Sequence, residues 1–248
     1  MAIFALADTH LSLSVDKPMD VFGSRWAGYM AKLDKAWREL VNESDTVIIP
    51  GDISWAMTLK EAKEDLLYLE SLPGKKIISK GNHDYWWDTV KKITEFFAEH
   101  GIKTIQLLHN NAYIVENMLV TGTRGWYPEG KNAPADSDFQ LVANREVGRL
   151  TLSLEAGEKL MSELPAGEAE KIIKCSFIHF PPVYRDYVFR EIVDVLHRYK
   201  IARCYFGHIH GVYDIPPVRV FEGIEFIPVA ADYLDFVPLR ITENTEIV

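Results

Sequence analysis

Short, strongly apolar runs alternate along the chain with longer stretches in which apolar residues recur at helical spacing. Several of the short runs are apolar throughout, which is typical of strands buried on both faces. The runs that predict strands are residues 3–7, 46–50, 76–79, 112–115, 118–121, 172–178, 203–206 and 226–229. Helical spacing covers residues 26–42, 59–71, 85–100, 139–163 and 187–199. This alternation predicts an α/β fold, with one hairpin around Glu116 and Asn117.

Local signals mark the ends of two of these helices. Thr58 followed by Glu61 has the spacing of a capping box, and Gly101 stands where a helix C-cap is expected. No repeat, low-complexity tract or linker divides the chain. We therefore predict that residues 1–248 form a single domain.

Polar residues collect where the predicted strands end. In α/β sheets, ligands bind beyond the carboxyl ends of strands, so neighbouring strands would bring these segments to one place. Five of the eight histidines fall in such segments, whereas His100, His109 and His197 lie on helices or in a loop. The segments are Asp8-Thr9-His10, Gly51-Asp52, Gly81-Asn82-His83-Asp84, His179-Phe180-Pro181-Pro182 and Gly207-His208-Ile209-His210-Gly211.

The residue types in these segments indicate a metal centre. They offer oxygen and imidazole nitrogen without thiolate, a set that suits Mn, Fe, Zn or Co. Seven candidate ligands are too many for one tetrahedral ion and suit two ions that share a carboxylate. The candidates are Asp8, His10, Asp52, Asn82, His179, His208 and His210.

Spacing and charge support the same site. Asp8 and His10 are two residues apart, as are His208 and His210, and in an extended segment such pairs point to the same side. Two aspartates against two divalent cations leave a charge of about +2, which would attract an anionic phosphate.

The composition and charge of the chain indicate which binding partners and which cellular compartment to expect. A net charge of -9 and a pI of about 5.4, without a dense Lys/Arg run, disfavour binding to extended nucleic acid and leave a small phosphorylated ligand. The N-terminus lacks the features of a signal peptide, and no apolar run is long enough to cross a membrane. Cys175 and Cys204 lie in apolar runs and suit core residues in a reducing compartment. We expect a cytoplasmic protein.

At these residues the sequence resembles the calcineurin-like metallophosphoesterase superfamily. The motifs D-x-H, GD, GNH[DE], a lone His and GHxH occur in order between Asp8 and His210. Single motifs of this kind arise often by chance, but the ordered set is specific. The resemblance implies a four-layer α-β-β-α sandwich with mixed sheets and a metal site at the C-terminal ends of the strands.

The resemblance also implies roles for individual residues. Asp52 would bridge the two metals, His83 would protonate the leaving oxygen, and Asp84 would orient His83. Asp8, His10 and His210 would hold one metal, and Asn82, His179 and His208 the other.

The chain departs from the family pattern in two places. Many members carry Arg directly after GNH[DE], where this chain has Tyr85, and an acidic residue soon after GD, where it has Ile53-Ser54-Trp55. These changes leave the seven candidate metal ligands intact and fall where the family makes its usual phosphate and substrate contacts. Arg124 follows a strand and could grip a phosphate or form a surface salt bridge.

Aromatic and loop residues near the predicted ligands have two interpretations each. Trp55, Trp86 and Trp87 could stack on a substrate ring or pack within the protein, and packing is the commoner role of Trp86 and Trp87. Residues 11–25 form a long loop that could act as a lid or simply cover the surface.

We therefore expect a hydrolase that cleaves phosphate monoesters or diesters with a hydroxide held by both metals. Two alternatives stay open. The first is a scaffold that keeps the fold for protein binding without catalysis, although it would be expected to lose His83 or several ligands. The second is a binuclear hydrolase of amides or lactones, against which the GNHD motif argues.

Overall fold

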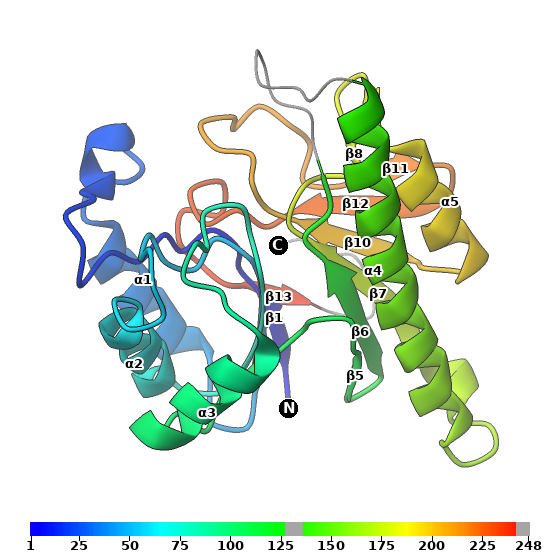
Figure 1. Cartoon of the computed structure of the whole chain (residues 1–248), viewed down its shortest axis with the longest axis horizontal. Coiled ribbons are helices and arrows are strands. Elements are labelled where there is room, and N and C mark those ends of the chain that lie inside the picture. The colour runs from blue at the N-terminus through cyan, green and yellow to red at the C-terminus, as the bar shows by residue number, and fades with distance from the viewer. Residues whose placement is uncertain (127–135, 242–248) are drawn as a thin grey trace.

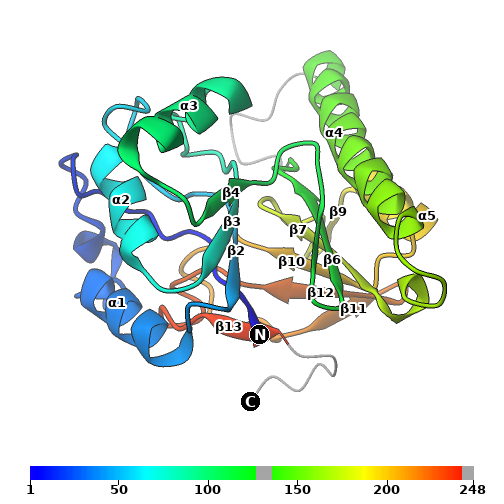
Figure 2. The same cartoon turned by 90° about the horizontal axis from the view of Figure 1, so that it is seen from below.

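Two β-sheets pack face to face, and helices cover the outer side of each sheet (Figure 2). The computed structural model describes residues 1–126 and 136–241, with residues 136–139 described by their backbone alone. The layers follow the order α-β-β-α, which confirms the predicted sandwich.

The first sheet is parallel except for one edge strand. Its spatial order is β13-β1-β2-β3-β4, in which only β13 runs antiparallel to its neighbour. Helices α1 (Tyr29–Leu40), α2 (Lys63–Ser71) and α3 (Val90–His100) cover its outer face. The strands are β1 (Ile3–Ala5), β2 (Thr46–Pro50), β3 (Lys75–Ser79), β4 (Ile105–Leu107) and β13 (Leu239–Ile241).

The second sheet has the order β11-β12-β10-β7-β6-β5, with antiparallel strands at both edges. The long helix α4 (Asp136–Ser162) and α5 (Arg190–Arg198) cover its outer face (Figure 1). Its strands are β5 (Tyr113–Val115), β6 (Met118–Thr123), β7 (Ile173–Ile178), β10 (Arg203–Phe206), β11 (Arg219–Phe221) and β12 (Ile224–Pro228).

Short elements complete the described chain. They are a two-stranded ribbon of β8 (Val183–Tyr184) and β9 (Tyr187–Val188), and the 3-10 turns η1 (Met19–Phe22) and η3 (Ala169–Lys171). In the described residues, no helix has both the length and the apolar character that a membrane span requires.

The central strands are buried on both faces, as their continuous apolar runs predicted. Within β2, Val47 and Ile49 pack toward the helices, whereas Ile48 packs into the layer between the sheets. Cys175 and Cys204 are free and fully buried. Burial raises the pKa of the Cys175 thiol to about 12, so it behaves as a small core residue.

All eight predicted strands and all five predicted helices are present, but several boundaries differ. Helix α3 begins at Val90 instead of residue 85. The Trp86 indole donates to the Asp84 carboxylate, and this contact holds the residues ahead of Val90 in a loop. The capping contact of Thr58 forms at 3.3 Å from Glu61 N, ahead of α2. Gly101 caps α3 with φ +72°. The short strands β4, β8, β9, β11 and β13 were not predicted.

Candidate metal centre

The five polar segments meet at the carboxyl ends of strands from both sheets. Two groups of side chains lie there with potential ligand atoms within 4.8 Å of one another. The first group is Asp8, His10 and His210, and the second is Asp52, His179 and His208. These groups contain six of the seven residues that the sequence analysis selected.

The seventh residue, Asn82, adjoins the second group. Its Oδ1 lies 2.7 Å from His179 Nε2, and Asp52 Oδ2 lies 3.5 Å from the same nitrogen. In the first group, His210 Nε2 is 3.2 Å from His10 Nε2 and 3.4 Å from Asp8 Oδ1.

One oxygen of Asp52 lies between the two groups. Asp52 Oδ2 is 3.5 Å from His179 Nε2 in the second group and 3.7 Å from His10 Nε2 in the first. Its other oxygen accepts a hydrogen bond from the backbone N–H of His83 at 2.8 Å. The carboxylate is therefore fixed on one side and open toward both groups on the other.

The electrostatics of the site fit bound cations. Asp8 Oδ1, Asp52 Oδ2 and His10 Nδ1 are buried without a hydrogen-bond partner among the described residues. Burial raises the pKa of Asp52 well above the usual carboxyl range, and the neighbouring Asp8 and Asp84 carboxylates add to the shift. Burial lowers the pKa of His179 to about 3, which favours the neutral imidazole that binds metals. Positive ions would compensate the two carboxylates and give Asp8 Oδ1 and Asp52 Oδ2 a partner.

Several site residues have a left-handed backbone that residues other than glycine seldom adopt. Asp8, His10, Asp52 and His208 have φ values of +60°, +44°, +53° and +71°. Such strain clusters at functional sites because the surrounding structure must maintain it. The assumption of extended D-x-H and H-x-H segments was therefore wrong. His208 and His210 contribute to different groups, whereas Asp8 and His10 contribute to the same one.

Two histidines are oriented through the ring nitrogen that points away from the site. His179 Nδ1 lies 3.0 Å from the Pro50 carbonyl oxygen, and His210 Nδ1 lies 2.8 Å from Asp232 Oδ1. Asp232 is fully buried and also accepts from Gly211 N and the Tyr213 hydroxyl. Burial lowers the pKa of His210, but the Asp8 and Asp232 carboxylates outweigh burial and raise this pKa to about 10. Such outer partners fix the ring orientation of metal-binding histidines.

The sequence analysis did not identify Asp232. The residue follows β12 in the segment Ala230-Ala231-Asp232, so a polar residue just past a buried strand was the available signal.

His83 lies beside the metal groups without belonging to either. Its ring centroid is 4.2 Å from that of Trp55 and 5.7 Å from that of His10. His83 Nδ1 has no partner among the described residues, and burial lowers the pKa of the imidazole. The Nδ1 atom is buried, but the residue as a whole is partly exposed, so part of it can contact a bound molecule.

Asp84 contacts backbone and indole N–H groups around it. Its carboxylate accepts from the backbone N–H of Asp52, Ile53 and Gly81 at 2.8–2.9 Å and from the Trp86 indole at 2.9 Å. These hydrogen bonds join the loop after β2 to the loop after β3. The resemblance implied that Asp84 orients His83. Asp84 would do so indirectly, by holding the backbone of these two loops.

The tryptophans near the site pack within the protein to different degrees. Trp55 stacks on His10 with centroids 4.9 Å apart, and Lys17 Nζ lies 4.4 Å from the Trp55 ring. Because Lys17 belongs to residues 11–25, this loop covers the Trp55 ring beside the site. Trp86 is buried and donates a hydrogen bond to Asp84, so it packs within the protein, as the sequence analysis favoured.

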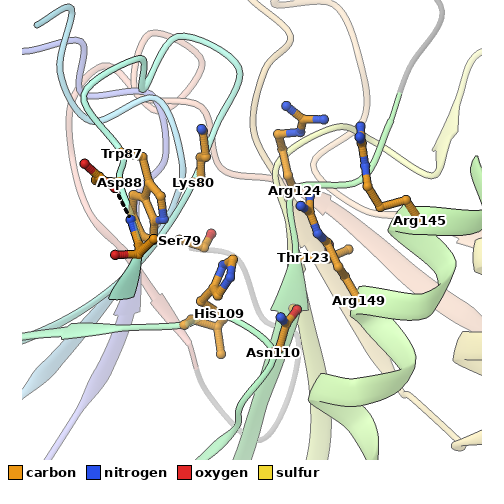
Figure 3. Close-up of a pocket in the computed structure, with 13 residues that line it drawn as sticks. Ser79, Lys80, Trp87, Asp88, His109, Asn110, Thr123, Arg124, Arg145 and Arg149 are labelled. Carbon is orange, nitrogen blue, oxygen red and sulfur yellow. Dashed lines mark hydrogen bonds between the residues drawn. The ribbon is translucent and has the colours of Figure 1, made fainter. Parts of the chain in front are cut away.

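Arg124 forms an ion pair, one of the two roles that the sequence left open for it. Its Nη2 is 3.5 Å from Glu146 Oε1, and its side chain lines a cavity next to the metal groups (Figure 3). The ion pair leaves Arg124 Nε without a partner among the described residues.

Close approach of the two loops requires glycine at position 81. A Cβ there would overlap the Asp52 carboxylate and backbone. We expect Gly81→Ala to destabilise the protein by about 1–3 kcal/mol and to weaken metal binding, because Asp52 must move. Gly148→Ala is the matched control, since a Cβ in α4 would meet no atom within 4 Å. The control should stabilise the helix by about 1 kcal/mol. Urea unfolding of the metal-stripped proteins measures the two stabilities, and elemental analysis after metal is restored measures metal binding. Equal stability of the two variants would contradict this account.

Comparison with known proteins agrees with the fold. Residues 1–212 match the family model described as calcineurin-like phosphoesterase. The protein TT1561 of Thermus thermophilus is 12% identical with a TM-score of 0.54, covering 93% of this chain and 89% of that one. AQ665 from Aquifex aeolicus, described as a protein of unknown function, is 15% identical with a TM-score of 0.48, covering 96% and 95%. No curated protein matches the chain. The likeness to TT1561 extends to the fold alone.

Proposed function

The chain belongs to the calcineurin-like phosphoesterase family, and we propose that it hydrolyses small phosphate esters at a centre of two metal ions. The position of Asp52 Oδ2, within 3.7 Å of a histidine from each group, is the observation that carries this proposal. It places one carboxylate oxygen where two ions could share it.

The residues that would hold the ions divide as the geometry groups them. Asp8, His10 and His210 would hold one ion, and Asn82, His179 and His208 the other, with Asp52 shared. The nitrogen and oxygen donors suit Mn, Fe, Zn or Co. Such ions, when bound, supply a nucleophile by lowering the pKa of water and withdraw charge from the phosphate.

The remaining chemistry would belong to side chains of the protein. His83 would donate a proton to the leaving oxygen, because its ring lies beside the metal groups and the residue is partly exposed. Asp84 would keep the His83 loop in place through its backbone hydrogen bonds. Arg124, partly exposed in the adjoining cavity, would bind an anionic part of the substrate.

The test measures metal binding and turnover in the same preparation. We expect close to two transition-metal ions per chain by elemental analysis, and hydrolysis of p-nitrophenyl phosphate that stops on chelation and returns when metal is restored. A scaffold without catalysis would bind ions but show no turnover on monoesters or diesters. Protein with no affinity for Mn, Fe, Zn or Co would refute the proposal.

A further inference from the structure

A cavity of about 510 Å³ lies between the carboxyl ends of β3 and β6, one strand from each sheet. We call it the cationic pocket. Figure 3 shows Lys80 and Trp87 on one wall and the arginines on the facing wall. The residues that matter to its chemistry are Ser79, Lys80, Trp87, Arg124, Arg145 and Arg149.

Positive charge in this pocket exceeds negative charge. All three arginines lie within 3.7 Å of one buried carboxylate oxygen, Glu146 Oε1, so a single negative charge serves three guanidinium groups. Lys80 adds a fourth cation; burial lowers its pKa and the nearby Arg124 adds to the shift. Asp88, the carboxylate that lines the pocket, is paired with Lys92 at 2.8 Å. This local excess contrasts with the net charge of -9 for the whole protein.

Two buried hydrogen-bonding groups in the pocket wall have no partner among the described residues. They are the Ser79 hydroxyl, on a residue 2% exposed, and the Trp87 indole N–H, on a residue 9% exposed. Buried polar groups are almost always hydrogen-bonded, so this pair at the cavity wall would donate to the oxygen of a bound water or of a ligand that displaces it. Arg124 Nε, also buried, is a third donor without a partner among these residues.

The pocket adjoins the second metal group. Ser79 and Lys80 lie directly before the Gly81-Asn82 segment, and on the other wall His179 N donates to the Thr123 carbonyl at 3.3 Å. A substrate phosphate at the metal groups and another anionic group in the pocket would therefore lie on one connected surface. The cavity is also large enough for a small organic moiety.

We propose that the cationic pocket binds a second phosphate group, so that the preferred substrates are small molecules with two phosphates, one of which is cleaved. The inference rests on the proposed phosphoesterase function. Guanidinium groups held by Glu146, with the Ser79 and Trp87 donors, would recognise the phosphate that remains.

Phosphate binding by the metal-stripped full-length protein tests the pocket without relying on catalysis. We expect titration calorimetry with inorganic phosphate to show a saturable site that Arg145→Gln/Arg149→Gln weakens at least tenfold. The paired Arg145→Lys/Arg149→Lys variant should retain most of the affinity. Arg198→Gln/Lys200→Gln, at two exposed positions at the end of α5, also removes two positive charges; it is the charge-matched control and should bind like the wild type. Thermal melts verify that each variant folds. If the double variant does not fold, Arg145→Gln alone replaces it, because this side chain is half-exposed and its loss should disturb the fold less.

Kinetics of the metal-loaded enzyme test the substrate class. Alkanediol bisphosphates of three to eight carbons are compared with the corresponding monophosphates. The best bisphosphate should exceed its monophosphate in kcat/KM by about tenfold, well above the factor of two that two equivalent phosphates give. The glutamine double variant should lose this advantage and leave monophosphate hydrolysis unchanged.

Two results would overturn the inference. One is the absence of saturable phosphate binding, or phosphate binding that is unchanged by the arginine substitutions. The other is a ratio of bisphosphate to monophosphate kcat/KM near two at every chain length. A metal-loaded protein that cleaves no phosphate ester would refute the proposed function instead, while the binding experiment would still decide whether the pocket recognises phosphate.

Discussion

Asp52→Asn is expected to leave fewer than two metal ions on the protein and to lower kcat/KM by about 10³-fold. Asp52 Oδ2 lies within 3.7 Å of His10 and His179, so the substitution reduces the charge that both ions would share. A loss of about 4 kcal/mol in transition-state stabilisation corresponds to this factor. Elemental analysis and steady-state kinetics on p-nitrophenyl phosphate measure the two effects.

Comparison with Asn82→Ala separates a shared ligand from a ligand of one ion. Asn82 Oδ1 contacts His179 in the second group, so its loss should weaken one ion and spare the other. Asp194→Asn on α5 makes the same chemical change as Asp52→Asn at an exposed residue and should affect neither metal content nor rate. If Asp52→Asn binds two ions with native affinity, the bridging role is wrong.

The sequence predicted the candidate ligands because each follows a buried strand and each has donor chemistry. Asp8, Asp52 and His179 come directly after apolar runs, and parallel strands bring their carboxyl ends to one edge. The left-handed φ values at Asp8 and His208 could not be predicted in this way. They depend on hydrogen bonds between loops far apart in sequence, such as His208 N to the Asp8 carboxylate at 2.9 Å.

The features that the sequence missed depend on contacts between distant segments. Asp232 is one acidic residue among many until the fold places it 2.8 Å from His210 Nδ1. The edge strands β4, β11 and β13 each contain a polar residue within three positions, so they lack the continuous apolar run that marked the equally short β1 and β5.

The cationic pocket was hidden for the same reason. Its residues come from the ends of β3 and β6, from the segments before α3 and after β4, and from α4. Ser79 and Lys80 directly precede the GNHD motif, but nothing in the sequence shows that Arg145 and Arg149 lie opposite them. His109, which the sequence analysis left outside the polar segments, lines this pocket. Sequence spacing therefore identified the candidate metal ligands but not the surface beside them.

His83→Ala is expected to keep both metal ions and to lower the rate by roughly 10²–10⁴-fold, the usual contribution of general acid–base catalysis. The imidazole lies 5.7 Å from the His10 ring between centroids, outside both metal groups, with Nδ1 unpartnered among the described residues. His197→Ala, at an exposed site on α5, controls for loss of an imidazole and should leave the rate unchanged.

Leaving-group dependence distinguishes proton donation by His83 from other roles. An alkyl phosphate releases a strongly basic oxygen that needs a proton, so His83→Ala should slow it most. The loss should be smaller with p-nitrophenyl phosphate, whose leaving oxygen scarcely needs protonation. Metal content measured in parallel excludes an indirect effect through the ions. Equal losses on the two esters would mean that His83 binds the phosphate, and unchanged rates on both would remove His83 from the mechanism and favour the non-catalytic scaffold.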